Sequence, residues 1–110
     1  MIEQSDIEIV DKEYFEIVEI KDFILVLQSR NTGHYWCLLE RIYNGCRTFQ
    51  ISHRHHPSDP FHRQKSKPSI ETCCDYIKSH DAYQLVKEHK KAERRQRRQA
   101  EKHGKKTLPR

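Results

Sequence analysis

The chain lacks the features that mark membrane proteins, secreted proteins and several large enzyme classes. Its longest apolar run, residues 23–27, is five residues long, whereas a membrane-spanning helix needs about 20. The acidic N-terminal residues do not resemble a secretory signal, which has a basic start and an apolar stretch. With three glycines in the chain, there is no glycine-rich phosphate loop. These absences predict a cytoplasmic protein that does not associate with membranes.

Catalytic and disulfide motifs are also missing. The four cysteines have no Cys-x-x-Cys spacing, two of them are adjacent (Cys73 and Cys74), and no export signal is visible, so reduced thiols are expected. There is no His-Glu-x-x-His motif, and no nucleophile stands beside a base in the sequence. We therefore expect no enzyme activity and no cofactor.

Positive charge is concentrated at one end of the chain. Residues 90–110 hold ten of the 21 Lys and Arg but two of the 16 Asp and Glu, so the remainder is mildly acidic although the whole chain carries +5. After residue 89, few apolar side chains remain that could pack in a core. The pattern predicts one small domain over residues 1–89 and a basic C-terminal extension over residues 90–110, helical or disordered until it binds a partner.

Apolar alternation and turn residues predict a small antiparallel sheet. Residues 23–27 read as a strand covered on both faces, and residues 34–43 and 47–55 read as two further strands. The apolar spacing of the first 22 residues fits a strand in part and an amphipathic helix in part. We therefore expect three to four strands joined by consecutive hairpins.

The dipeptide Asn44-Gly45 is the strongest hairpin signal in the chain. A two-residue turn there pairs Tyr43 with Cys46 and fixes the register of both strands. Residues directly opposite each other share a face of the sheet. One face then holds Trp36, Leu38, Phe49 and Ile51, with His34, His53 and His55 at the end away from the turn.

The rest of the chain is predicted to be helical after a loop. Residues 56–67 contain turn-forming prolines and read as a loop. Ser69 is suited to cap a helix whose buried stripe would include both Cys73 and Cys74. Asp81, with Gln84 three residues later, predicts the start of a second helix that runs into the basic tail. The expected fold is α+β, with the sheet followed by two helices.

The basic residues predict a nucleic-acid interface. On a helix, Lys91, Arg95, Arg98 and Lys102 fall within about 60° of one another. Arginine suits phosphates because its planar fork donates two hydrogen bonds and stays charged. The residues expected to bind nucleic acid are Lys91, Arg94, Arg95, Arg97, Arg98 and Lys102 in the tail, with Arg54, Arg63, Lys65, Lys67, Tyr35 and Tyr43 in the domain.

The aromatic residues divide between base stacking and core packing. Aromatic rings beside cations are what single-stranded nucleic acid needs, and Tyr35, Tyr43 and Phe61 have this position. Trp36 and Phe49 fall on the expected core face, so packing is favoured for them. Arg47 belongs to the basic residues of the third strand.

Three other interpretations remain open. The tail could be a solubilising segment with no partner. The protein could instead dock on a nucleic-acid enzyme or its guide RNA as an inhibitor, using its acidic first 22 residues or its second sheet face. The histidines could form a small metal-binding module, with His34, His53, His55 and His62 as the ligand candidates, although no metal is favoured by their spacing.

The segments Ile51-Ser-His-Arg-His-His56, Asp59-Pro-Phe-His-Arg-Gln64 and Ile77-Lys-Ser-His-Asp81, together with Trp36, resemble small accessory proteins of mobile genetic elements in Gram-positive bacteria. The resemblance covers about residues 25–83 and omits the tail. It implies a setting in phages or conjugative elements, whose small proteins regulate, copy or protect nucleic acid or, like anti-CRISPR proteins, inhibit defence nucleases. DNA versus RNA, sequence preference, protein partner and oligomeric state do not follow from it.

Overall fold

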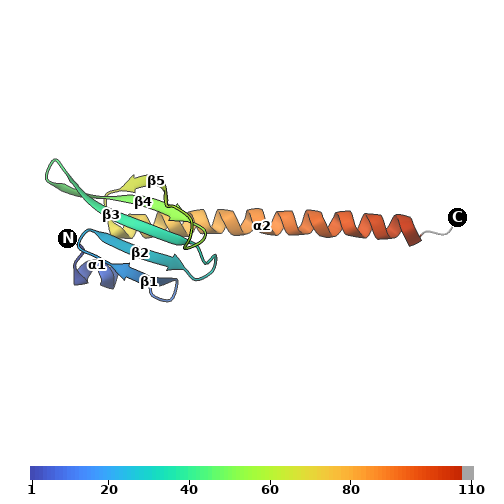
Figure 1. Ribbon diagram of the computed structural model, residues 1–110, viewed down its shortest axis with the longest axis horizontal. Helices are drawn as coiled ribbons and strands as arrows, with labels where there is room; N and C mark the ends of the chain where they lie inside the picture. The colour runs from blue at the N-terminus through green and yellow to red at the C-terminus, as the bar shows by residue number, and fades with distance from the viewer. Residues whose placement is uncertain (108–110) are drawn as a thin grey trace.

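The computed structural model describes residues 1–107 of the chain, with side chains through Glu101. The fold is an antiparallel sheet with a short helix, α1 (Gln4–Ile9), before it and a long helix, α2 (Ile70–Thr107), after it (Figure 1). The strands lie in the sheet in sequence order: β1 (Phe15–Ile20), β2 (Ile24–Ser29), β3 (Tyr35–Tyr43), β4 (Cys46–Arg54) and β5 (His62–Lys67). The predicted α+β class is confirmed.

The hairpin between β3 and β4 has the predicted register. Tyr43 pairs with Cys46, and Trp36 pairs with His53. Asn44 and Gly45 both adopt positive φ, 51° and 75°, as a two-residue turn with the twist of its strands requires. Alternation then separates an inner face, which α2 covers, from an outer face that is open to solvent. The inner face carries the buried side chains of Trp36, Leu38, Phe49 and Ile51.

The first turns of α2 close the core against the inner face. Ser69 caps the helix as predicted, because its Oγ accepts a hydrogen bond from the backbone N–H of Thr72 at 3.1 Å. The predicted stripe is buried as well, with Cys73 and Ile77 fully covered. From residue 85 to residue 101 every side chain is exposed, and here α2 projects past the sheet (Figure 1). The molecule is therefore elongated, 76 × 26 × 24 Å.

One of the five strands was not expected from the sequence pattern, and another lies in a segment left open between strand and helix. The sheet has five strands rather than three to four, because residues 15–20 form β1 and residues 62–67, expected to lie in a loop, form β5. Most side chains of β5 are exposed and none is apolar, so it shows no alternation. β5 pairs with β4 through backbone hydrogen bonds at the edge of the sheet, and such bonds do not require a particular pattern of side chains.

The predicted start of a second helix at Asp81 is wrong. A single helix runs through this position, and the other helix, α1, precedes the sheet. Asp81 is fully buried, and its carboxylate accepts hydrogen bonds from the hydroxyls of Tyr14 at 2.7 Å and Thr32 at 3.2 Å. Because those two groups satisfy the carboxylate, it does not compete for backbone N–H groups and interrupt the helix.

Although α2 is long, its composition is polar. Among the residues that the structure describes, no helix is both long enough and apolar enough to cross a membrane.

Candidate functional site

The part of α2 beyond the sheet, residues 85–101, forms an exposed basic rod that we call the basic helix end. It presents the predicted residues Lys91, Arg94, Arg95, Arg97 and Arg98, all exposed. Within this segment, Nε2 of His89 lies 3.0 Å from Oε1 of Glu93, a contact that is an ion pair when the imidazole is protonated. Among the side chains described, none of those five cations lies within ion-pair distance of a carboxylate. The side chain of Lys102 lies outside the described residues.

At the end of β4, Arg54 lies against aromatic rings on the outer face. Its guanidinium carbon is 4.2 Å from the ring centroid of Phe61 and 5.4 Å from that of Tyr35. Its Nη1 also donates to the backbone carbonyl of Asp59 at 3.4 Å. Cation–π contacts on this scale restrict the side chain while leaving its charge in place. The predicted residues Tyr35 and Arg54 therefore form one small cationic and aromatic surface.

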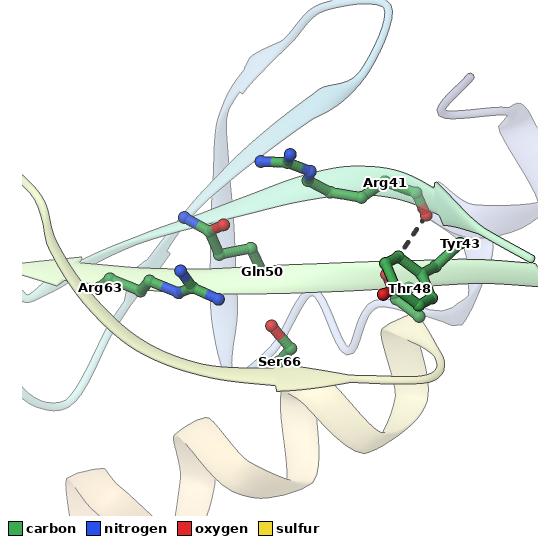
Figure 2. A pocket seen from close by; sticks show the side chains of 6 residues that line it. All are labelled: Arg41, Tyr43, Thr48, Gln50, Arg63 and Ser66. Carbon is green, nitrogen blue, oxygen red and sulfur yellow. Dashed lines mark hydrogen bonds between the residues drawn. The ribbon is translucent and has the colours of Figure 1, made fainter.

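A hollow of about 220 Å³ lies on the outer face nearer the Asn44-Gly45 turn (Figure 2). Arg41 from β3 and Arg63 from β5 flank Gln50 from β4, and the lining is completed by Tyr43, Thr48 and Ser66. The structure thus brings together Tyr43 and Arg63, two predicted residues. Arg41 was missed, although its alternation with Tyr43 on the same strand already placed it on the outer face.

The remaining predicted cations of the domain point elsewhere. Lys65 pairs with Ile51 and Lys67 with Phe49, so both belong to the inner face. Lys67 Nζ lies 5.7 Å from the ring centroid of Tyr76 on α2. A register irregularity between Ile51 and Ser52 is what returns Arg63 to the outer face. The domain cations therefore do not form one continuous patch.

The predicted histidines gather at the end of the sheet from which α2 projects. One nitrogen from each of His34, His53 and His55 lies within 4.8 Å of the others. His62 is beside His53 in the sheet but does not belong to this group. His80 of α2, which sequence reasoning missed, has its ring centroid 5.1 Å from that of His53. Only the packing of α2 on the sheet brings His80 here, so no local pattern could have indicated it.

Burial favours the neutral form of the two central histidines. Desolvation, followed by repulsion from the other histidines, lowers the pKa of His53 to about 4. Burial, then the charge of His55, lowers the pKa of His34. Nδ1 of His34 lies 3.1 Å from Nε2 of His53, and a single proton shared between these atoms makes a hydrogen bond. Neutral imidazoles in this arrangement can accept a proton, hold one, or ligate a metal.

Comparisons with known proteins give no match for this chain, whether with family models, curated proteins or solved structures.

The lowered pKa of His53 predicts a loss of stability in mild acid. The imidazole of the unfolded chain takes up its proton near pH 6.5 and that of the folded chain near pH 4, so stability falls as the pH falls through this window. From pH 7.5 to pH 5, His53 alone is expected to lower the free energy of unfolding by about 2 kcal/mol. Urea unfolding in the presence of a chelator measures this loss. A His53→Gln variant has no charge to gain there and should lose less; equal losses in the two proteins would refute the assignment.

Proposed function

We propose that this protein binds nucleic acid in the cytoplasm, in a regulatory and non-catalytic role, through the basic helix end and the β3–β5 part of the outer sheet face. The observation that carries the proposal is the projecting, exposed segment of α2 with the five predicted cations Lys91, Arg94, Arg95, Arg97 and Arg98, none of which forms an ion pair with a described side chain. A setting in mobile genetic elements stays a prediction from the sequence resemblance alone.

The length and exposure of the basic helix end suit contact with the phosphate backbone of a nucleic acid. A helix that buries no apolar face gains nothing from packing, so its sequence is free to serve a surface role. Residues 85–107 span about 35 Å at the usual helical rise, close to one turn of a nucleic-acid duplex. Cations along such a rod can reach several phosphates in succession and release the counterions that those phosphates hold.

The outer face supplies a different kind of contact. Tyr35 and Phe61 beside Arg54 offer a flat, cationic surface on which an unpaired base can stack. The hollow between Arg41 and Arg63 adds two more guanidinium groups. Glu16 and Glu19 belong to β1 at the opposite edge of the sheet, so we limit the interface to β3–β5.

The salt dependence of binding tests this proposal. If these five predicted cations each neutralise one phosphate, log K on duplex DNA should fall with log salt at a slope near −4.5. Fluorescence anisotropy with labelled duplex DNA, single-stranded DNA and RNA, each over a series of salt concentrations, measures the slope. An Arg94→Gln/Arg97→Gln variant keeps residues that favour a helix but removes two charges. The magnitude of its salt slope should therefore be smaller by about 1.8.

A charge-matched control separates the basic helix end from net charge. The Lys12→Gln/Lys21→Gln variant also removes two positive charges, but from the α1 and β1 side of the domain. It should leave the slope unchanged. A slope near zero for the native protein, or equal reductions in the two variants, would contradict the proposal. Capture of a protein partner that survives nuclease treatment, with no nucleic acid bound, would favour the inhibitor interpretation.

A further inference from the structure

We propose that His34, His53 and His55 bind one divalent transition-metal ion, with zinc as the favoured ion. The three imidazoles lie at the open end of one hairpin. His34 directly precedes β3, His53 belongs to β4, and His55 directly follows β4. Their candidate ligand atoms lie within 4.8 Å of one another. Neutral imidazole is a preferred ligand for zinc, and three histidines with one open position are a known zinc ligand set.

The spacing of the rings suits a shared ion. With Zn–N bonds of about 2.0–2.1 Å in a tetrahedral site, two ligand nitrogens lie about 3.3 Å apart. Nδ1 of His34 and Nε2 of His53 are 3.1 Å apart, close to that separation. The ring centroid of His53 is 5.0 Å from that of His34 and 5.0 Å from that of His55. The separation already fits an ion, but the two nitrogens point at each other in the hydrogen bond, so each ring has to turn for both to point at the ion.

His55 has to turn to complete the set. Its ring stacks on that of His34, with centroids 4.0 Å apart and planes at 11°, and parallel rings cannot both aim a nitrogen at one point. His55 is exposed, so its side chain can rotate out of this stack into solvent-accessible space. The proposed site thus combines two buried histidines at ligand distance from each other with an exposed third histidine that rotates to complete the set.

Neighbouring residues bury His34 and His53, and one side of the proposed site stays accessible. His34 and His53 are both buried, and the indole of Trp36 stacks on His53 with centroids 4.1 Å apart. A hollow of about 400 Å³ adjoins His53 and His55 and is lined also by Arg54, Asp59, His62 and Gln64. An ion can enter from this side, and the hollow has room for a water molecule or another small ligand in the fourth position.

The ordinary alternative is a hydrogen bond between His34 and His53 with no metal. The two interpretations differ at His55, which takes no part in that hydrogen bond. A His55→Ala variant removes the third ligand without opening a cavity in the core. His56→Ala is the matched control, because His56 is the adjacent exposed histidine and lies outside the cluster.

Zinc titration of the chelator-treated full chain tests the proposal. Native mass spectrometry should find one zinc ion per chain, and calorimetry should give the same stoichiometry. Loss of one direct ligand should weaken binding at least as much as loss of an outer partner does, so His55→Ala should weaken it by about 100-fold or more, and His56→Ala should leave it unchanged. Circular dichroism checks that both variants fold.

A spectroscopic readout places the ion. Trp36 is the only tryptophan in the chain and stacks on His53, so Cu²⁺, a quencher of indole fluorescence, should quench the native protein and the His56→Ala variant at one equivalent. His55→Ala should need a large excess. Absence of a one-to-one zinc complex would overturn the proposal, and so would equal zinc affinity in the His55→Ala and His56→Ala variants.

Discussion

Replacement of Trp36 by alanine is expected to lower the free energy of unfolding by about 3–5 kcal/mol. The indole is fully buried on the inner face, where it stacks on His53 and meets the rings of Tyr76 and His80 edge-on. Its Nε1 donates to Oγ of the buried Ser29 at 3.1 Å. The change would therefore leave a large cavity and an unpartnered hydroxyl. Urea unfolding followed by circular dichroism measures the loss without relying on tryptophan fluorescence.

Two further substitutions serve as comparisons for the stability loss of Trp36→Ala. Trp36→Phe keeps an aromatic ring but gives up the hydrogen bond to Ser29, so a smaller loss of about 1–3 kcal/mol is expected. Tyr43→Ala removes an aromatic side chain that is 73% exposed and should change stability by no more than about 0.5 kcal/mol. If Trp36 stacked on nucleic-acid bases instead, Trp36→Ala would weaken nucleic-acid binding while leaving stability near that of Tyr43→Ala.

The features of this fold that could be predicted are those encoded locally. Asn44-Gly45 specifies a two-residue turn, and that turn fixes which residues of β3 and β4 lie opposite one another. The burial of Trp36 and the gathering of His34, His53 and His55 both follow from this register. The start of α2 at Ser69 was predictable for the same reason, because a cap and an apolar stripe are adjacent in the sequence.

The features that escaped prediction depend on contacts between distant segments. Asp81 looks like a cap until Tyr14 and Thr32, far away in the sequence, are seen to bind its carboxylate. β5 pairs through its backbone, which carries no residue-specific signal. His80 reaches His53 only when α2 packs on the sheet. In each case the deciding interaction is a tertiary contact, and local sequence patterns do not indicate such contacts.

Arg47 shows the same limit for electrostatics. In the sequence it belongs with the basic residues of the third strand and suggests phosphate binding. In the structure its guanidinium donates to both carboxylate oxygens of Asp6, at 3.2 and 2.8 Å, and to Glu40 Oε2 at 2.7 Å. The bonds from Arg47 are the largest cause of the lowered pKa of Asp6. Arg47 therefore joins α1 to the inner face of β3 and β4, and its charge is already balanced.

Replacement of Arg47 by alanine is expected to lower the free energy of unfolding by about 3 kcal/mol. The side chain of Glu40 is 1% exposed and that of Asp6 is 7% exposed, so both carboxylates would stay buried with one partner fewer. Glu40 would keep the N-terminal ammonium of Met1 at 2.6 Å, and Asp6 would keep the backbone N–H of Glu3 at 2.8 Å. Removal of one partner from a fully buried ion pair costs about 3–5 kcal/mol. Arg47 itself is 41% exposed, and water can enter the space it leaves, which places the expected loss at the lower end of that range.

Two control variants, Arg41→Ala and Arg47→Lys, test whether the loss of stability comes from the ion pairs of Arg47. Arg41→Ala, on the neighbouring strand, removes an exposed arginine that has no ion pair among the described residues, and should cost no more than about 0.5 kcal/mol. Arg47→Lys keeps the charge but not the planar fork that reaches both carboxylates at once, so its loss should fall between the two. Urea unfolding at pH 7.5 ranks all three variants. Equal losses for Arg47→Ala and Arg41→Ala would show that the buried carboxylates find other partners, and that Arg47 is free to bind phosphate as its position in the sequence first suggested.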